Sequence, residues 1–271
     1  MSGSASIPPT LPAPPTRIVS LVPSLTEALF ALGLGDRVVA VTDWCVHPAD
    51  RVAQLPKIGG TKNPDVKRIE SLAPHLVIAN QEENRRRDVE RLEGAGIPVW
   101  LTYPRTVREG AELLEALCEL GVDPETRRQV VDPVSQAVAA AERAPLDEPL
   151  PVFCPIWRDP WMAVGGDTYA DDLIRLCGGR NVFATAPGRR YPRVTVDQIV
   201  AARPELVLLP DEPYAFGPRD VAELSGLDLP AAREGRIHLI DGTLVSWYGP
   251  RIRQAIATLR LLFGAGGRGG N

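Results

Sequence analysis

The sequence predicts an α/β protein with two similar lobes, each with a central parallel sheet, joined by one long backbone helix. Short apolar strands alternate with amphipathic helices along the chain, as in sheets built from βα units. One phrase occurs twice, as IESLAPHLVIAN at Ile69–Asn80 and as IVAARPELVLLP at Ile199–Pro210. Two copies this far apart are too few for a solenoid. They predict two lobes, each using the phrase as a short helix that leads into a central strand.

The first lobe is predicted over residues 17–122. It opens with a strand at 17–23 and a helix whose expected N-cap is Ser24, with Glu27 as its capping-box partner. Gly33 or Gly35 is expected to end this helix, because glycine adopts the left-handed conformation common at helix ends. The remaining elements expected in this lobe are strands at 37–43, 75–80 and 97–103 and helices at 65–74, 87–96 and 106–121.

The linking helix is predicted over residues 123–146, with Asp123 as its cap and Pro124 at the first helical position. Pro133 is expected to kink or locally break it. A single helical connector is stiff, so we do not expect large hinge closure. The second lobe is predicted over residues 147–263, with strands at 151–157, 205–210 and 236–242 and helices at 168–179, 195–204, 220–227 and 246–263.

Composition narrows the possible functions. The chain has 271 residues, of which 44% are hydrophobic and 24% charged, values ordinary for a folded protein. A net charge of −4 argues against a broad nucleic-acid surface. No apolar run approaches the roughly 18 residues that a membrane helix requires. We therefore expect a monomer that neither binds nucleic acid nor inserts into a membrane.

The two ends are predicted to be flexible tails, at residues 1–16 and 264–271. The first has neither the basic nor the apolar region of a signal peptide, which favours the cytoplasm. A periplasmic or extracellular location would follow if the true start carries a leader. The scattered cysteines, which form no CxxC motif, are expected to be reduced and mostly buried.

Four segments carry a resemblance to a known family. They are RIVSLVPSLTEALFALGLGDRVVAVTDWCVHP, PDVKRIESLAPHLVIA, GGDTYADDLIRLCGGRNVF and YPRVTVDQIVAARPELVLL. In this order they resemble the helical-backbone (class III) substrate-binding proteins of ABC importers, the receptors for cobalamin, haem and ferric siderophores. The match covers residues 17–263 and is closest to the cobalamin-binding proteins. It implies a ligand cleft between two lobes, with cobalamin or another corrinoid as the ligand and no intrinsic cofactor.

Large aromatic residues fall at the ends of predicted strands, where α/β lobes gather their ligands. The resemblance implies that Trp44, Trp157 and Tyr191 stack on a corrinoid and that Trp247 lies in the stretch that closes the pocket. Arg190, beside Tyr191, could meet an anionic group on the ligand. The predicted ligand-binding residues are Trp44, Trp157, Trp161, Arg190, Tyr191, Trp247 and Tyr248.

The sequence also departs from the pattern of this family. Two stacking tryptophans of the enteric-type receptors have no counterpart here, near Thr61 and at Asn80. Importer-coupled members usually carry a glutamate on each lobe that pairs with permease arginines. Here those positions are Lys67 and Asp197, so we expect docking to an ABC permease to be weakened.

Enzyme chemistry is not indicated, since no GxSxG, P-loop or GxGxxG motif is present at a strand–helix turn. The three histidines lie in different segments and form no chelating pair, so no metal site is predicted. Haem or a ferric siderophore is the alternative ligand. A two-lobed nucleotide-sugar enzyme is the alternative from another class.

Overall fold

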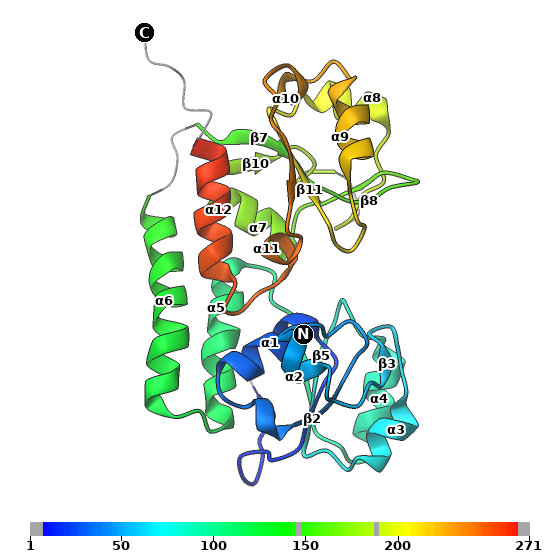
Figure 1. Cartoon of the computed structure of the whole chain (residues 1–271), viewed down its shortest axis with the longest axis vertical. Coiled ribbons are helices and arrows are strands. Elements are labelled where there is room, and N and C mark those ends of the chain that lie inside the picture. Colours follow the sequence, from blue (N-terminus) through cyan, green and yellow to red (C-terminus); the bar gives the residue numbers. More distant parts are fainter. Residues whose placement is uncertain (1–7, 145–147, 187–189, 265–271) are drawn as a thin grey trace. The chain divides into compact units, whose positions relative to one another are not determined.

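Figure 1 shows a computed structural model of the chain, which describes residues 8–144, 148–186 and 190–264. The chain divides into two compact units. The first unit holds the described residues of 1–104, 108–135 and 248–250, and the second holds those of 105–107, 136–247 and 251–271. The predicted α/β class with a parallel sheet in each lobe is confirmed, as is the long helix α6 (Pro124–Arg143), within which the chain passes from the first unit to the second.

The first unit is built on a four-stranded parallel sheet of order β2-β1-β5-β6. Its strands are short and its connections are helical, as parallel pairing requires. Before α6 the chain forms β1 (Ile18–Ser20), α1 (Pro23–Ala31), η1 (Gly35–Arg37), β2 (Val38–Val41), α2 (Ala49–Val52), β3 (Gly59–Gly60), β4 (Asn63–Pro64), α3 (Val66–Ser71), β5 (Leu76–Asn80), α4 (Arg86–Gly94), β6 (Val99–Thr102), α5 (Val107–Ala116) and η2 (Leu117–Leu120).

The second unit repeats this plan with a parallel sheet of order β10-β7-β11-β12. By chain order, β7 corresponds to β1, β10 to β2, β11 to β5 and β12 to β6. After α6 the chain forms β7 (Leu150–Phe153), β8 (Pro155–Trp157), β9 (Met162–Ala163), α7 (Tyr169–Leu176), β10 (Gly179–Asn181), α8 (Val196–Ala202), β11 (Leu206–Pro210), α9 (Pro218–Ser225), α10 (Pro230–Arg233), β12 (Ile237–Ile240), α11 (Thr243–Ser246) and α12 (Ile252–Gly264).

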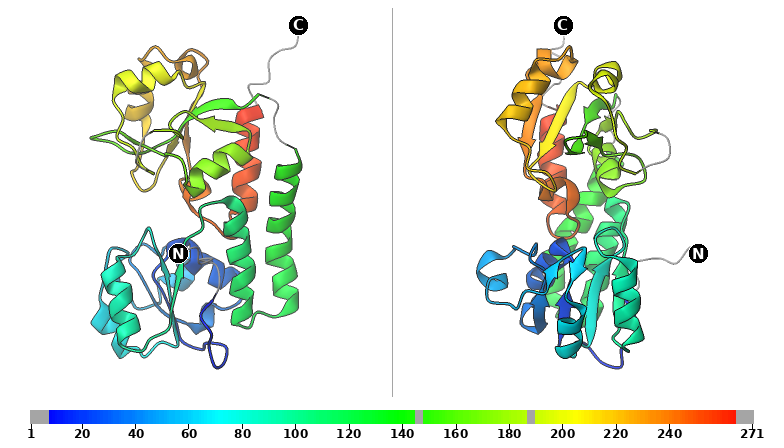
Figure 2. Two further views of the ribbon diagram at one scale, coloured as in Figure 1. Left: turned by 180° about the vertical axis from the view of Figure 1, so that it is seen from behind. Right: turned by 90° about the vertical axis from the view of Figure 1, so that its right-hand side faces the viewer.

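Each unit has its own apolar core between sheet and helices. In the first unit, Ile69 of α3 and Leu92 of α4 are fully buried with Val77 of β5. Helices α3 and α4 pack side by side there, and in the second unit α7 packs with α12 (Figure 2). In the second core, Ile199 of α8 and Leu224 of α9 are buried with Val207 of β11. Equivalent helices therefore cover equivalent strands.

The repeated phrase has the same local structure in both units. Strands β5 and β11 are buried at every position and lie third in their sheets. A non-glycine residue in the left-handed region follows the helix before each strand: Ala73 with φ 44°, two residues after α3, and Arg203 with φ 49°, directly after α8. Each of these residues precedes a proline, which disfavours the right-handed helical conformation in the residue before it. The proline therefore helps to end the helix and start the strand.

Three expectations about helices are corrected. Helix α1 begins at Pro23 and not after a Ser24 cap, because proline is well suited to the first helical position and needs no N–H partner there. Helix α12 begins at Ile252, since Gly249 takes φ 109° and Pro250 follows it. Helix α6 is not broken at Pro133, and a kink there stays a prediction. The predicted Asp123 cap is present, since the backbone N–H of Thr126 donates to Asp123 Oδ1 at 2.9 Å.

Only part of each predicted tail lies within the described residues. Residues 1–7 lie outside the described part of the chain, as do residues 265–271 of the predicted C-terminal tail. Pro15 is buried, and the backbone N–H of Thr16 donates to His75 Nδ1 at 3.3 Å. The end of the predicted tail is therefore ordered against the first unit.

The left-handed residue before Pro74 generates a stability prediction. Ala73→Val is expected to lower the free energy of unfolding by about 2 kcal/mol, because a β-branched residue is sterically strained at positive φ. Ala73 is exposed, so no core packing is lost. Ala73→Gly is the control, with an expected change below about 1 kcal/mol because glycine tolerates this conformation. Urea unfolding measures both variants, and equal losses would contradict the prediction.

The cysteines are free thiols, with Cys45, Cys154 and Cys177 buried and Cys118 half-buried, as the sequence predicted. Burial raises the pKa of Cys154 to about 12 and that of Cys118 to about 11. Because the thiolate is the reactive form, we expect iodoacetamide at pH 8 to leave Cys154 unmodified in the native protein. Mass spectrometry checks this against a urea-denatured control in which all cysteines react. Native alkylation of Cys154 at the denatured rate would show the prediction to be wrong.

Candidate functional site

The carboxyl ends of the parallel strands in each unit lie at one edge of its sheet, which is where α/β units bind ligands. At this edge of the first unit, Trp44 follows β2 and is 66% exposed. Its indole Nε1 lies close to Gly60 of the short β3–β4 hairpin, within 3.6 Å of where a Cβ on Gly60 would stand. The first unit therefore presents one large exposed aromatic ring beside this edge.

Asn80, the last residue of β5, organises the same edge. Its side-chain amide is buried and donates to Tyr248 Oη at 2.8 Å and to Thr102 Oγ1 at 3.4 Å. The side-chain oxygen Oδ1 of Asn80 accepts from the backbone N–H of Glu82 at 2.7 Å. Burial raises the pKa of Tyr248 well above its usual range, so this phenol stays neutral. Asn80 thus fixes both the loop after β5 and the position of Tyr248.

The loop near Thr61 is tied to the same network. Asn84 Nδ2 donates to the carbonyl oxygen of Thr61 at 2.9 Å, and the backbone N–H of Asn80 donates to Asn84 Oδ1 at 2.7 Å. Thr61 and Asn80, the two positions singled out from the sequence, thus lie in one hydrogen-bonded polar network. This edge of the first unit is therefore polar at Thr61, Asn80 and Asn84.

The second unit gathers aromatic rings at the corresponding edge. Trp157 ends β8 and is 43% exposed, with its ring edge-to-face against Tyr214 at a centroid distance of 5.6 Å. Trp161 is buried and stacks on Phe216 at 5.8 Å with an interplanar angle of 8°. Arg158 lies over Trp161 and forms ion pairs with Asp220, at 2.6 Å, and with Glu223. Buried rings thus support an exposed one.

Tyr191 and Arg190 lie on a segment that runs along the β8–β9 hairpin. Met162 bridges Arg193 in antiparallel pairing, and the backbone N–H of Gly165 donates to the carbonyl oxygen of Arg190 at 2.8 Å. Both residues are half-buried. The structure therefore brings this segment beside the hairpin that carries Trp157, as a ligand site on the second unit requires.

Trp247 lies after β12 and is buried. Its side chain and that of Ser246 donate hydrogen bonds to Glu212, and the Arg251 guanidinium lies 5.1 Å from the centre of its ring. The pKa of Glu212 is raised above its usual value, mainly because the carboxyl group is buried. Trp161, Trp247 and Tyr248 are thus each engaged by their own unit, whereas Trp44 and Trp157 are exposed. Ligand binding by these residues stays a prediction, and the exposed rings are the better candidates.

Tyr214 was not singled out from the sequence. It lies four residues after the end of β11, so an aromatic shortly after the repeated phrase was the available signal. Its packing partners, Trp157 and Phe216, do not follow from any local pattern.

Lys67 and Asp197 occupy equivalent places in the two units. Each is the second residue of its helix, in α3 and α8 respectively, and each is exposed. The predicted correspondence between them is consistent with the topology. Their role in docking stays a prediction.

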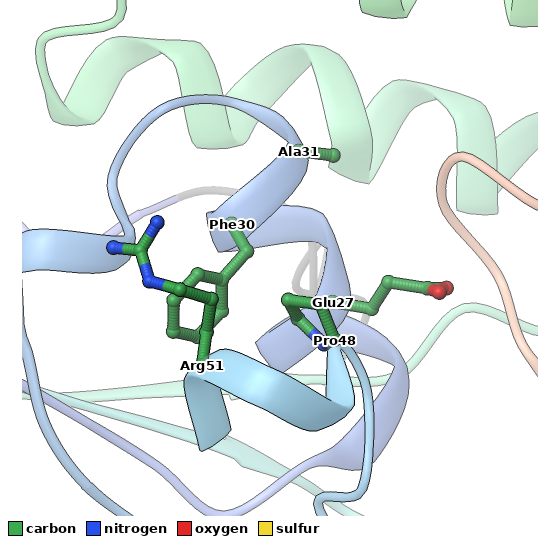
Figure 3. Close-up of a pocket in the computed structure, with 5 residues that line it drawn as sticks. All are labelled: Glu27, Phe30, Ala31, Pro48 and Arg51. Atoms are coloured by element: carbon green, nitrogen blue, oxygen red, sulfur yellow. The ribbon is translucent and has the colours of Figure 1, made fainter. Parts of the chain in front are cut away.

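A pocket of about 260 Å³ lies in the first unit, between α1 and α2 (Figure 3). Its walls are the Phe30 ring, with the Arg51 guanidinium 5.3 Å from the ring centre, together with Glu27, Ala31 and Pro48. This volume is below that of ordinary small-molecule sites, and no predicted ligand residue lines the pocket. We assign it no function.

Two further searches cover only the described residues. No helix among them is long and apolar enough to cross a membrane. Within the same part of the chain, no three or more His, Cys, Asp or Glu side chains are grouped so that they could hold a metal ion.

Comparison with known proteins identifies the family. Residues 18–244 match the family model described as periplasmic binding protein. The chain belongs to this family. It is therefore a substrate-binding protein, and the family implies a small-molecule ligand and association with an ABC transporter.

Similar sequences include the vitamin B12-binding protein of Photorhabdus laumondii, with 30% identity over 74% of this chain and 72% of that protein. The vitamin B12-binding protein of Vibrio parahaemolyticus is 26% identical over 90% of this chain and 87% of that protein.

Solved structures show the same fold. The periplasmic vitamin B12 binding protein BtuF of Vibrio cholerae gives a TM-score of 0.84 at 24% identity, covering 95% of this chain and 100% of that chain. The periplasmic heme-binding protein RhuT of Roseiflexus gives 0.74 at 28% identity, covering 91% and 97%.

The Asn80 network generates a prediction about stability. Asn80→Ala is expected to lower the free energy of unfolding by about 2–3 kcal/mol, because it removes the buried hydrogen bonds that Asn80 makes to Tyr248 and to the loop after β5. Gln81→Ala, at the exposed neighbouring position, is the control and should change stability by less than about 0.5 kcal/mol. Chemical unfolding measures both. Equal stability of the two variants would contradict the role given to Asn80.

Proposed function

We propose that this chain is a non-catalytic binding protein that captures cobalamin or a related corrinoid. The observation that carries the proposal is the pair of exposed indoles, Trp44 and Trp157, one beside the carboxyl edge of each sheet. A planar macrocycle binds to broad, rigid apolar faces with few polar contacts. The names of the similar vitamin B12-binding proteins support a corrinoid as the ligand.

Tyr191 and Arg190 supply the second part of the proposed site. Tyr191 adds a phenol ring beside the hairpin that carries Trp157. Arg190 is proposed to meet a phosphate or carboxylate on the ligand, which requires its guanidinium, buried in this structure, to become accessible. The expectation that the ligand lies between the two lobes stays a prediction.

Haem is the second candidate ligand, and a specific observation favours it. Solved heme-binding proteins resemble this chain at 26–28% identity, and the exposed rings would suit either tetrapyrrole. The resemblance implies a stacking ring at the position of Asn80 in the enteric-type receptors, and the polar network found there leaves room for a different tetrapyrrole. A ferric siderophore stays the third candidate. Membership of a binding-protein family favours all three over the nucleotide-sugar enzyme.

The family also bears on where the protein acts and on which partner it docks to. We infer that the protein acts in the periplasm, the second of the two locations considered from the sequence, because its family is described by that compartment. Lys67 in place of a glutamate reverses the charge at one proposed docking position, whereas Asp197 keeps it at the other. Docking to a permease is therefore proposed to be weaker than in members with two carboxylates.

The proposal is tested by mixing the purified protein with cyanocobalamin, cobinamide or haemin, desalting, and recording the visible spectrum. We expect retained corrinoid bands. Trp157→Ala and Trp44→Ala should each raise Kd by about tenfold, since each removes a large stacking surface.

Leu261→Ala is the matched control, because Leu261 is an exposed apolar residue of α12 that belongs to no proposed site. It should bind as the wild type does. Retention of haemin alone would replace corrinoid with haem as the ligand. Retention of none of the three, or unchanged affinity in both tryptophan variants, would reject the proposed site.

A further inference from the structure

The turn after β11 packs against Trp157, but none of its residues is among the predicted ligand-binding residues. This turn, residues 211–216, leaves the sheet at its carboxyl edge and carries Tyr214 and Phe216. We call it the β11 turn. The β11 turn and Trp157 both belong to the second unit.

Tyr214 connects an exposed ring to buried ones. Its ring centre lies 5.6 Å from that of Trp157, at an interplanar angle of 69°, and 4.7 Å from that of Phe216. Phe216 is buried and stacks on Trp161. Edge-to-face and tilted contacts of this kind are favourable between aromatic rings. The half-buried Tyr214 and the exposed Trp157 thus form adjacent parts of one aromatic surface, supported from the core.

The β11 turn is anchored at its start to the segment after β12. Glu212 Oε1 accepts from Ser246 Oγ at 2.8 Å, and the Glu212 side chain also accepts from Trp247. Asp211 Oδ1 accepts from the backbone N–H of Gly242 at 2.7 Å.

The approach of the two segments is close enough to require glycine. A Cβ on Gly242 would lie 2.5 Å from Glu212 Cγ and 2.8 Å from Glu212 N. A half-buried carboxylate with two donors in such a restricted space has little freedom to move. Glu212 therefore holds the chain two residues before Tyr214.

We propose that Tyr214 contacts the ligand as one aromatic surface with Trp157, and that Glu212 positions Tyr214 by anchoring the β11 turn. This inference rests on the proposed function, because the ligand is taken to be a flat conjugated ring system. It adds a binding residue and a positioning residue to that site. Aromatic rings held rigidly in advance lose little conformational entropy when a planar ligand binds.

Equilibrium dialysis against cyanocobalamin tests the contact. Tyr214→Leu should raise Kd by about tenfold, whereas Tyr214→Phe, which keeps the ring, should stay within about twofold of the wild type. Wild-type affinity in Tyr214→Leu would overturn the contact.

A double-mutant cycle tests the positioning role. Glu212→Ala should raise Kd by about fivefold, and Ser246→Ala, at an exposed position less prone to misfolding, by about twofold. In the Tyr214→Leu background neither change should weaken binding further, because both act through Tyr214. Additive losses would assign Glu212 a merely structural role and overturn this part. Glu234→Ala, an exposed acid of the same unit, is the charge-matched control and should bind normally.

Failure of the inference is distinguishable from failure of the proposed function. A wild-type protein that binds neither cyanocobalamin nor haemin would overturn both. If the wild type retains haemin alone, the same variants are titrated with haemin, and the same pattern of losses is expected. A wild type that binds while Tyr214→Leu binds equally well overturns the inference alone.

Discussion

In each unit, the fully buried central strand is the constraint on which the rest depends. β5 and β11 are apolar or uncharged at every position and lie inside their sheets, so both faces must be covered. Helices supply that cover, and a helix between parallel strands returns the chain to the same end of the sheet. All strands then finish at one edge. The side chains that follow the strands therefore lie together at this edge.

The duplicated phrase made the architecture predictable from sequence. It predicts a short helix, a proline and a central strand, and the helix end at the proline depends on neighbouring residues only. The errors lie where a special residue outweighed the general pattern. A helical apolar spacing with Ser24 suggested a side-chain cap, but the fixed φ of Pro23 starts α1 without one. The amphipathic pattern predicted one helix over 246–263, but Gly249 and Pro250 delay α12 to Ile252.

The candidate site was predictable only in outline. Strand order places Trp44, Trp157 and Trp247 beside the carboxyl edges, and the structure agrees with that placement. Exposure is a separate matter, because it depends on partners far along the chain. Trp161 is covered by Phe216 and Trp247 is held by Glu212, at sequence separations over which no periodicity operates. Tyr214 was missed for the same reason, since only its packing against Trp157 distinguishes it from any loop tyrosine.

The hydrogen bond between Asn80 and Tyr248 has a consequence for biosynthesis. Tyr248–Pro250 belongs to the first unit, although the residues on both sides of it belong to the second. The N-terminal unit therefore cannot complete its polar network until nearly the whole polypeptide has left the ribosome. A fragment that stops within α6 would lack a native partner for Asn80. The two units repeat one plan, yet the N-terminal one is completed by residues from near the C-terminal end of the second.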